Sequence, residues 1–321
     1  MSRSNLLKYI LKRVLTAVFV LLLVSVLIFI AIRLAPGDPV LNQIGPYGER
    51  TPEREAAIRA QMGLDKPEVV QYFYWLGNVL QGNFGVSSRN GVPALNYILE
   101  KVPASLELVA VSIVFALILS IPFGILAGVK KGSPLDQGIS FISSSLLAIP
   151  SFCIGLVLIY TLAVNLKVLD ASGYVSFTQD PAKNLKLLIM PALSLGLMEL
   201  ATFTRFIRSD TIEVMGSNYI RTAKAKGLPP KKIYFKHAFK NILVTLITVI
   251  GLEFGTLLGG TVIVEKVFGW SGVGWLIYQS VVNRDYNVVQ CAVLMIAAAF
   301  VIINTIIDIL YAAIDPRIRL E

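Results

Sequence analysis

Six long apolar runs constrain the fold of this chain more than any other feature. Four contain no charged residue and two contain one glutamate each; they cover residues 14–32, 108–129, 138–166, 187–204, 242–264 and 288–307. An apolar run of about 18 residues or more is long enough to cross a bilayer as a helix. Only 15% of the 321 residues are charged, fewer than a water-soluble domain of this length carries. The sequence therefore predicts an all-α membrane protein with six transmembrane helices.

The positive charges indicate which loops face the cytoplasm. Of the 29 lysines and arginines, 17 lie before the first run, in the turn after the second, between residues 205 and 240, and in the tail. Such an excess marks the cytoplasmic side, and six spans place both termini there. The formal net charge of +9 then reflects topology and contact with anionic lipid of the bilayer. Nucleic acid is not expected as a partner.

The polar stretch at residues 35–103 predicts a small extracytoplasmic subdomain between the first two spans. Thr51 followed by Pro52 is typical of a helix start, because threonine caps and proline suits the first helical position. A second helix is expected over residues 67–80. Its aromatic side chains suit a position at the membrane surface: Tyr72, Phe73, Tyr74 and Trp75.

Motifs for catalysis and metal binding are weak. No Gly-Lys pair exists, so the chain lacks a nucleotide-binding P-loop. Gly269-Trp270-Ser271-Gly272 matches the Gly-x-Ser-Gly pattern of intramembrane proteases, which also require a histidine base on a membrane helix. The only histidine, His237, lies in the basic loop, and Cys153 and Cys291 lie inside apolar runs. We expect no catalytic residue, metal or cofactor.

Two acidic residues fall within the expected spans, Glu199 and Glu253, and Asp308 directly follows the last span. A carboxylate at the bilayer centre costs about 2.5–3.5 kcal/mol on insertion scales, so such groups usually face a bundle interior or a watered path. Glu199 and Glu253 are candidates for a translocation path, although a role as hydrogen-bonding groups inside the bundle stays open. Asp308, near the end of the last span, is interpreted as structural.

The basic segment at residues 208–240 separates the fourth and fifth spans. Ser217 or Asn218 is suited to cap a helix that begins at Tyr219, and Gly227 is suited to end it. A loop that only fixed topology would not need a capped helix. The segment is therefore interpreted as a rigid element on which a partner protein docks.

The expected helix in this segment has one narrow face of small and apolar groups, made by Tyr219, Ile220, Ala223 and Gly227. Arg221 and Lys224 flank that face. Small side chains allow another protein's surface to approach closely. A second helix is expected from Pro230, with a stripe of lysines suited to lipid headgroups at positions 232, 236 and 240.

The segment resembles the EAA loop of permease subunits of binding-protein-dependent ABC importers, whose core is Glu-Ala-Ala-x-x-x-Gly. Here the three core positions are Arg221, Thr222 and Ala223, so the glutamate is absent, and Gly227 has the expected spacing. Further stretches similar to the dipeptide/oligopeptide/nickel branch occur in order: Ala35–Pro39, Met62–Pro67 with Gln71 and Tyr72, Pro103–Leu108, His237–Asn241, Glu265 with Phe268, Gly272 and Gly274, and Asp308 and Tyr311 with Asp315–Arg317.

This resemblance implies a type I ABC importer permease fold, as the first permease of a pair. It implies a heterodimer with a second homologous permease, two ATPase subunits and an extracytoplasmic solute-binding protein, in the cell membrane of a prokaryote. ATP hydrolysis would belong to the ATPase subunits. The residues implied to couple the chain to them are Ser217, Tyr219, Ile220, Arg221, Thr222, Ala223, Lys224 and Gly227.

The expected organisation has three parts. Residues 1–102 hold the first span and the extracytoplasmic subdomain, residues 103–314 form the transporter domain with the coupling loop at 208–240, and residues 315–321 form a cytoplasmic tail. Short peptides are the expected cargo, with nickel, glutathione or oligosaccharides as alternatives for the same machinery. An ion-coupled secondary transporter is the alternative from a different class.

Overall fold

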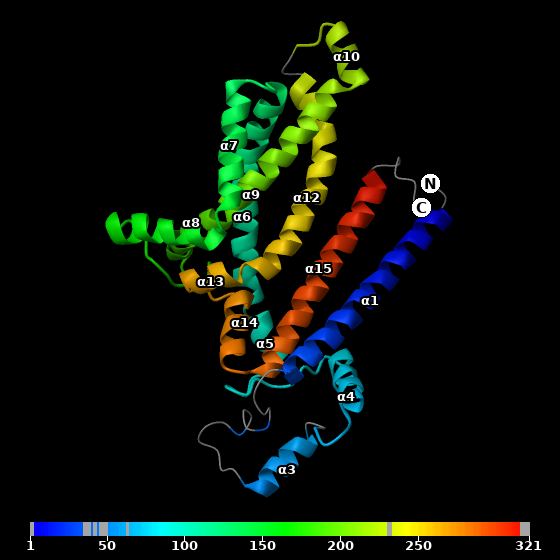
Figure 1. Ribbon diagram of the computed structural model, residues 1–321, viewed down its shortest axis with the longest axis vertical. Helices are drawn as coiled ribbons and strands as arrows, with labels where there is room; N and C mark the ends of the chain where they lie inside the picture. Colours follow the sequence, from blue (N-terminus) through cyan, green and yellow to red (C-terminus); the bar gives the residue numbers. More distant parts are fainter. Residues whose placement is uncertain are drawn as a thin grey trace.

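The computed structural model describes residues 3–34, 40, 44, 51–61, 64–229 and 233–314 (Figure 1). Within this part the regular secondary structure is helical, apart from one isolated antiparallel bridge between Val86 and Pro93. Five described helical stretches are long and apolar enough to cross a membrane: Leu11–Leu34, Ala94–Val129, Pro181–Gly216, Asn241–Gly260 and Tyr286–Ile307. The chain is a multi-span, all-α membrane protein, as the apolar runs predict.

A bent pair of helices is the candidate for a sixth span. Helix α7 (Pro134–Ala148) meets α8 (Ser151–Leu158) at 95°, and α8 continues as the π-helix η1 (Ile159–Asn165). The break falls at Ile149, whose backbone is extended (φ −103°, ψ 122°), directly before Pro150. A residue before proline is pushed out of the helical region by contact with the proline ring. The run at 138–166, expected as one tilted or broken span, is therefore broken.

Two long helices, α6 (Val102–Val129) and α9 (Pro181–Gly216), form the centre of the molecule. A Cβ at Gly124 would lie 2.6 Å from Ile207 Cβ, and one at Gly128 would lie 2.5 Å from Thr211 Cβ. Glycines four residues apart let membrane helices approach closely, and close packing replaces the hydrophobic drive that lipid does not supply. The spacing of these glycines therefore sets how near α6 and α9 lie.

A second glycine stripe joins α12 (Phe239–Gly260) to α15 (Tyr286–Ile314). Side chains of α15 occupy the space that Cβ atoms would fill: Ile307 lies over Gly251 and Phe300 lies over Gly255. The expected fifth span at 242–264 ends earlier than predicted, since α12 stops at Gly260 and a separate short helix, α13 (Val262–Phe268), follows. Helix α14 (Val273–Val282) then leads to α15.

The first span, within α1 (Arg3–Leu34), packs mainly on α15 (Figure 1). Helices α3 (Pro52–Gln61) and α4 (Glu68–Leu80) follow, close to their predicted bounds, and α5 (Ala94–Leu99) leads into α6. The backbone N–H of Arg54 donates to Thr51 Oγ1 at 3.3 Å, as expected for the predicted cap. The loop after α4 is fastened to the start of α15, because Ser87 Oγ donates to the buried carboxylate of Asp285.

Different helices project from the two ends of the molecule (Figure 1). Helix α10 (Asn218–Ala225) stands at one end, and α3 and α4 lie at the other. The start of α1 and the end of α15 both point toward the α10 end. The stretches at Ala35–Pro39, Met62–Gly63 and Asp315–Arg317, and the whole tail 315–321, lie outside the described residues.

The crossing of α6 and α9 predicts opposite effects for two glycine-to-alanine changes. Gly124→Ala places a methyl group against Ile207 and is expected to destabilise the fold by about 1–3 kcal/mol, a typical overpacking penalty. Gly138→Ala, in the interior of α7 with open space around it, is the matched control and is expected to stabilise by up to about 1 kcal/mol through helix propensity. Thermal unfolding in detergent measures both. Equal melting temperatures for the two variants would contradict the tight crossing.

Candidate functional site

The expected docking helix exists as α10, directly after α9. The chain breaks at Ser217, whose backbone is extended (φ −70°, ψ 153°). Ser217 occupies the cap position predicted for it, yet its hydroxyl makes no cap hydrogen bond to α10 and donates instead to the carbonyl of Val214 at 2.5 Å. Its side chain therefore closes the end of α9, and α10 begins at Asn218 rather than Tyr219.

The far end of α10 is closed at Gly227, as predicted. Gly227 has φ +71°, a left-handed conformation that side chains with a Cβ adopt at a penalty. Its N–H donates to the carbonyl of Lys224 at 2.9 Å, and the N–H of Leu228 donates to the carbonyl of Ala223 at 3.3 Å. This pair of bonds is the Schellman motif, which satisfies the last carbonyls of a helix. Both ends of α10 are thus fixed by local chemistry.

The small apolar face of α10 packs against its own chain. Ile220 is 0% exposed and Ala223 is 7% exposed, and both belong to the core that also holds Ile233 and Ala238 of η2 (Ile233–Ala238). Tyr219 stays partly exposed, and its hydroxyl accepts from Asn241 Nδ2 at 3.0 Å. Ile220 and Ala223 therefore anchor α10 instead of offering the surface for close approach that the helical wheel predicted.

The face that α10 turns outward is polar and basic. Its exposed residues are Asn218, Tyr219, Arg221, Thr222, Lys224, Ala225, Lys226 and Gly227. We call this set the α10 basic face. The lysine stripe was expected at positions 232, 236 and 240. Residue 232 lies outside the described part, and so do the side chains of Lys236, His237 and Lys240. Backbone geometry shows that the predicted second helix is a π-helix, η2, which runs into α12.

An ion pair braces the same end of the molecule. The Arg208 guanidinium on α9 donates from Nε and Nη2 to the two carboxylate oxygens of Asp136, at 2.5 and 2.9 Å. Asp136 also accepts from the N–H of Gly132, so the turn before α7 joins the pair. Paired, planar contacts of this kind are geometrically specific. This pair has no signal in the local sequence, because 72 residues separate its members. Only the Ser133-x-x-Asp136 helix-start pattern points to Asp136.

The two candidate path residues lie on neighbouring helices. Glu199 on α9 is 5% exposed, and its Oε2 has no hydrogen-bond partner. Glu253 on α12 is half-buried, and the two carboxylates interact electrostatically. The structure thus brings together two residues that are 54 positions apart. Asp308 belongs to α15, but its side chain lies outside the described part.

A buried carboxylate organises the opposite end of the core. Glu265 on α13 is fully buried and accepts from Ser105 Oγ at 2.7 Å, Thr261 Oγ1 at 2.9 Å and the N–H of Trp275 at 2.8 Å. The N–H of Gly274 donates to it as well. We call these five residues the Glu265 corner. One acceptor-only side chain therefore joins α6, α13 and α14.

Burial raises the pKa of Glu265 above its ordinary value of 4.5, while the four hydrogen bonds act in the opposite direction. The resemblance had pointed to Glu265, Gly272 and Gly274 without giving them a role. Glu265 accepts the hydrogen bonds, and the two glycines permit the close packing: a Cβ at Gly272 would collide with Ser105 Oγ and the Glu265 carboxylate, and one at Gly274 would lie 2.7 Å from Val262 Cα.

The Gly269–Gly272 stretch, which matches a protease pattern, also serves this corner. Gly269 ends α13 in the left-handed conformation (φ 61°), and the Trp270 indole donates to the carbonyl of Ala104 at 2.8 Å. Ser271 Oγ accepts from Lys101 Nζ at 2.9 Å. Across the described residues, no group of three His, Cys, Asp or Glu side chains is arranged to hold a metal ion.

Comparison with known proteins assigns a class to this arrangement. Residues 120–320 match the family model described as "Binding-protein-dependent transport system inner membrane component". Residues 6–120 match the model for the N-terminal part of such membrane components. The chain belongs to the family of inner membrane components of binding-protein-dependent transport systems.

Particular relatives are similar over nearly the whole chain. An oligopeptide transport system permease, AppB of Bacillus subtilis, is 40% identical over 314 residues, covering 97% of this chain and 99% of the relative. A probable peptide ABC transporter permease of Sinorhizobium fredii, y4tP, is 37% identical over 311 residues with the same coverage. The inward-facing MetNI methionine ABC transporter shares the fold, with a TM-score of 0.53 at 19% identity over 68% of this chain and 94% of that chain.

The Glu265 corner predicts a pH-dependent stability. Glu265→Gln introduces an NH₂ group among four donors and is expected to lower the free energy of unfolding by about 1–3 kcal/mol. Because the folded pKa is raised, the folded chain binds the proton more tightly than the unfolded chain above pH 4.5. The stability contributed by this group therefore declines as the pH rises through the folded pKa.

Thermal unfolding of the detergent-solubilised chain from pH 4.5 upward measures this dependence. Glu100→Gln, at an exposed position near the start of α6, is the control and should keep the wild-type pH profile. An unchanged profile in Glu265→Gln would show that the corner carboxyl does not titrate differently in the two states.

Proposed function

We propose that this chain is a permease subunit that forms part of the translocation path of an ATP-driven importer of short peptides. The observation that carries the proposal is similarity over 97% of the chain to permeases whose names specify peptides and oligopeptides. The helix α10 supports it, because it is capped at Gly227 and held by Ile220 and Ala223. A rigid projecting helix is what a mechanical connection to another subunit requires.

The partners follow from the family. A second homologous permease completes the path as a heterodimer, one of two ATPase subunits binds the α10 basic face, and an extracytoplasmic binding protein delivers cargo. The positive charge of Arg221 and Lys224 favours an acidic surface on the ATPase. In this arrangement the ATPase subunits hydrolyse ATP, and this chain is not an enzyme.

The orientation follows from the placement of charge. The α10 end, where the start of α1 and the end of α15 also point, faces the cytoplasm of a prokaryotic cell. Helices α3 and α4 then belong to an extracytoplasmic subdomain, in line with a first unit at residues 1–102. Movement of α10 with an ATPase subunit reaches the spans through α9, which is continuous with it except at Ser217.

Glu199 and Glu253 are proposed to face the translocation path. Glu199 has a buried carboxylate oxygen without a hydrogen-bond partner, and it interacts with the second carboxylate of Glu253. This arrangement is unfavourable in a closed bundle. Water or a cationic group in a translocation path removes the penalty. Transport that depends on ATP and persists without a proton gradient separates this role from ion coupling.

Uptake of a radiolabelled tripeptide into proteoliposomes that contain the complete transporter tests the function. Uptake is expected to require internal ATP and the binding protein, and to survive a protonophore. The purified chain alone is expected to hydrolyse no ATP. Uptake by this chain alone, driven by a proton gradient and lost in Glu253→Gln, would establish a secondary transporter instead.

Charge reversal tests the α10 basic face within the same assay. The double variant Arg221→Glu/Lys224→Glu is expected to lower ATP-driven uptake by about tenfold or more, because like charges would face each other across the contact. Its melting temperature should stay near the wild-type value, since both side chains are exposed.

The matched control is Lys130→Glu/Lys131→Glu, in the exposed basic turn between α6 and α7. This control removes the same charge from the same end of the molecule but leaves α10 intact. Equal uptake by both double variants would show that α10 makes no specific charged contact.

A further inference from the structure

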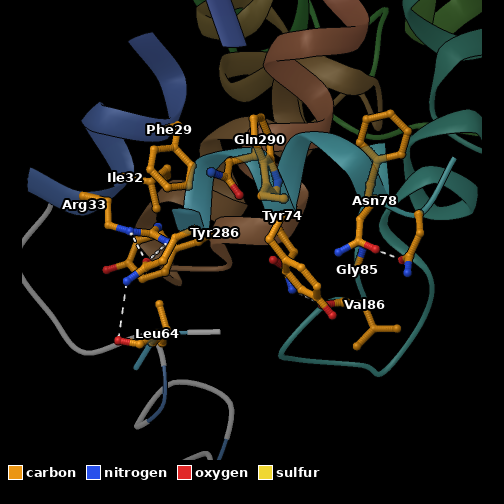
Figure 2. Close-up of a pocket in the computed structure, with 15 residues that line it drawn as sticks. Phe29, Ile32, Arg33, Leu64, Tyr74, Asn78, Gly85, Val86, Tyr286 and Gln290 are labelled. Carbon is orange, nitrogen blue, oxygen red and sulfur yellow. Dashed lines mark hydrogen bonds between the residues drawn. The ribbon is translucent and has the colours of Figure 1, made fainter. Parts of the chain in front are cut away.

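A pocket of about 390 Å³ lies where α1 ends (Figure 2). Its walls come from the last turns of α1, from α4, from residues 83–86 and from the start of α15. Phe29, Arg33, Tyr74, Tyr286 and Gln290 are drawn around it in Figure 2. The pocket has no part in the coupling and path sites described above, which lie on α9, α10 and α12.

The contacts between α1 and α4 place this pocket at the edge of the membrane. The apolar span of α1 ends at Leu34, yet Ser25 Oγ is hydrogen-bonded to Tyr72 of α4 at 2.8 Å. At 1.5 Å per residue, Ser25 lies about 13 Å before that end along the helix axis. The Phe29 ring also meets Tyr72 and Trp75, with centroids 5.4 and 5.7 Å apart. Helix α4 therefore lies beside the last turns of the span, not beyond them.

The outer surface of α4 is apolar, as expected for a helix that lies beside the last turns of the α1 span. Val69, Phe73 and Leu80 are exposed large apolar side chains, and they recur at helical spacing. Tyrosine and tryptophan side chains are typical of the zone where hydrocarbon meets lipid headgroups. Tyr72, Tyr74 and Trp75 of α4 bring three such rings to this zone. The pocket between α1 and α4 thus opens at the level of the headgroups.

The charged side chain among the described residues that line the pocket is a cation, Arg33, which favours an anion. Nε and Nη2 of Arg33 both donate to Gln71 Oε1, at 3.1 and 2.6 Å, and the guanidinium lies 4.1 Å from the Phe29 ring centroid. These contacts fix the guanidinium against the wall. Lys66, outside the lining, places its Nζ 5.4 Å from the ring centroid of Tyr74, a pocket residue, and Glu68 interacts electrostatically with Arg33. Arginine held in this way is suited to a phosphate oxygen.

Two further polar side chains line the pocket, and one of them lacks a hydrogen-bond partner. The hydroxyl of Tyr286 is buried and has no hydrogen-bond partner. Gln290, only 6% exposed, has its side chain at the pocket wall (Figure 2). A buried hydroxyl without a partner costs about 1–3 kcal/mol, and an acceptor oxygen in the pocket removes that penalty.

We propose that this pocket binds the phosphate-bearing headgroup of a phospholipid from the leaflet opposite α10. The phosphate lies against Arg33 and accepts from the Tyr286 hydroxyl, and the first carbons of the acyl chains follow α1 at Ile32. Bound lipid then holds α4 against α1, so it stabilises the subdomain independently of transport.

Native mass spectrometry of the delipidated full chain in detergent tests the site with palmitoyl-oleoyl-phosphatidylglycerol as the probe. We expect one lipid bound above background and an affinity about tenfold lower in Tyr286→Phe, which loses one hydrogen bond to a charged acceptor. Arg33→Gln should lower it further. Because the Tyr286 hydroxyl has no protein partner, Tyr286→Phe should keep the lipid-free melting temperature, which separates lost binding from lost folding.

The matched controls are Arg89→Gln, an arginine near the start of α15 that does not line this pocket, and Tyr160→Phe, an exposed tyrosine on η1. Both should bind the lipid as the wild type does. Equal affinity in Tyr286→Phe, Arg33→Gln and the two controls would overturn the proposal. Equally tight binding of dioleoylglycerol, which lacks phosphate, would overturn the role of the headgroup. Displacement of the lipid by millimolar inorganic phosphate would overturn the lipid in favour of a free anion.

Discussion

The close crossing of α6 and α9 is the constraint on which the rest of the structure depends. In a bilayer, apolar side chains gain little by leaving lipid, so helices associate through tight packing and hydrogen bonds. Gly124 and Gly128 supply the packing, because they leave room for Ile207 and Thr211. Since α9 leads directly into α10 and α6 begins beside the Glu265 corner, this crossing sets the position of both ends of the core.

The Glu265 corner and the Asp136–Arg208 pair act as polar fasteners at these two ends. Each joins residues far apart in the sequence, 160 positions for Ser105 and Glu265 and 72 for Asp136 and Arg208. In each, the buried carboxylate accepts hydrogen bonds from several donors, because a buried charge without such partners would be costly. The long helices are thus packed by glycines along their length and fixed by carboxylates at their ends. Such an arrangement suits a bundle whose helices move as units.

Much of this fold was predictable from local sequence. Apolar run length predicted the spans, Thr51-Pro52 predicted the start of α3, and Gly227 predicted the end of α10, because each depends on neighbouring residues alone. The sequence could not predict the 95° bend at Pro150, because a proline in a membrane run either kinks or breaks a helix, depending on its surroundings. A helical wheel grouped Ile220 with Ala223 correctly, yet it held no information about η2, which covers them. Residues 72 or 160 positions apart gave no pairing signal at all.

The length of α9 has a mechanical consequence. The helix has 36 residues and contains Pro191, where one backbone hydrogen bond is missing, so bending there is easier than elsewhere. About 15 Å of helix precede that point and about 38 Å follow it, at 1.5 Å per residue. A bend at Pro191 would make α9 a lever with unequal arms. A displacement at α10 would then arrive at the Pro181 end reduced to less than half, and the force would be larger in the same proportion.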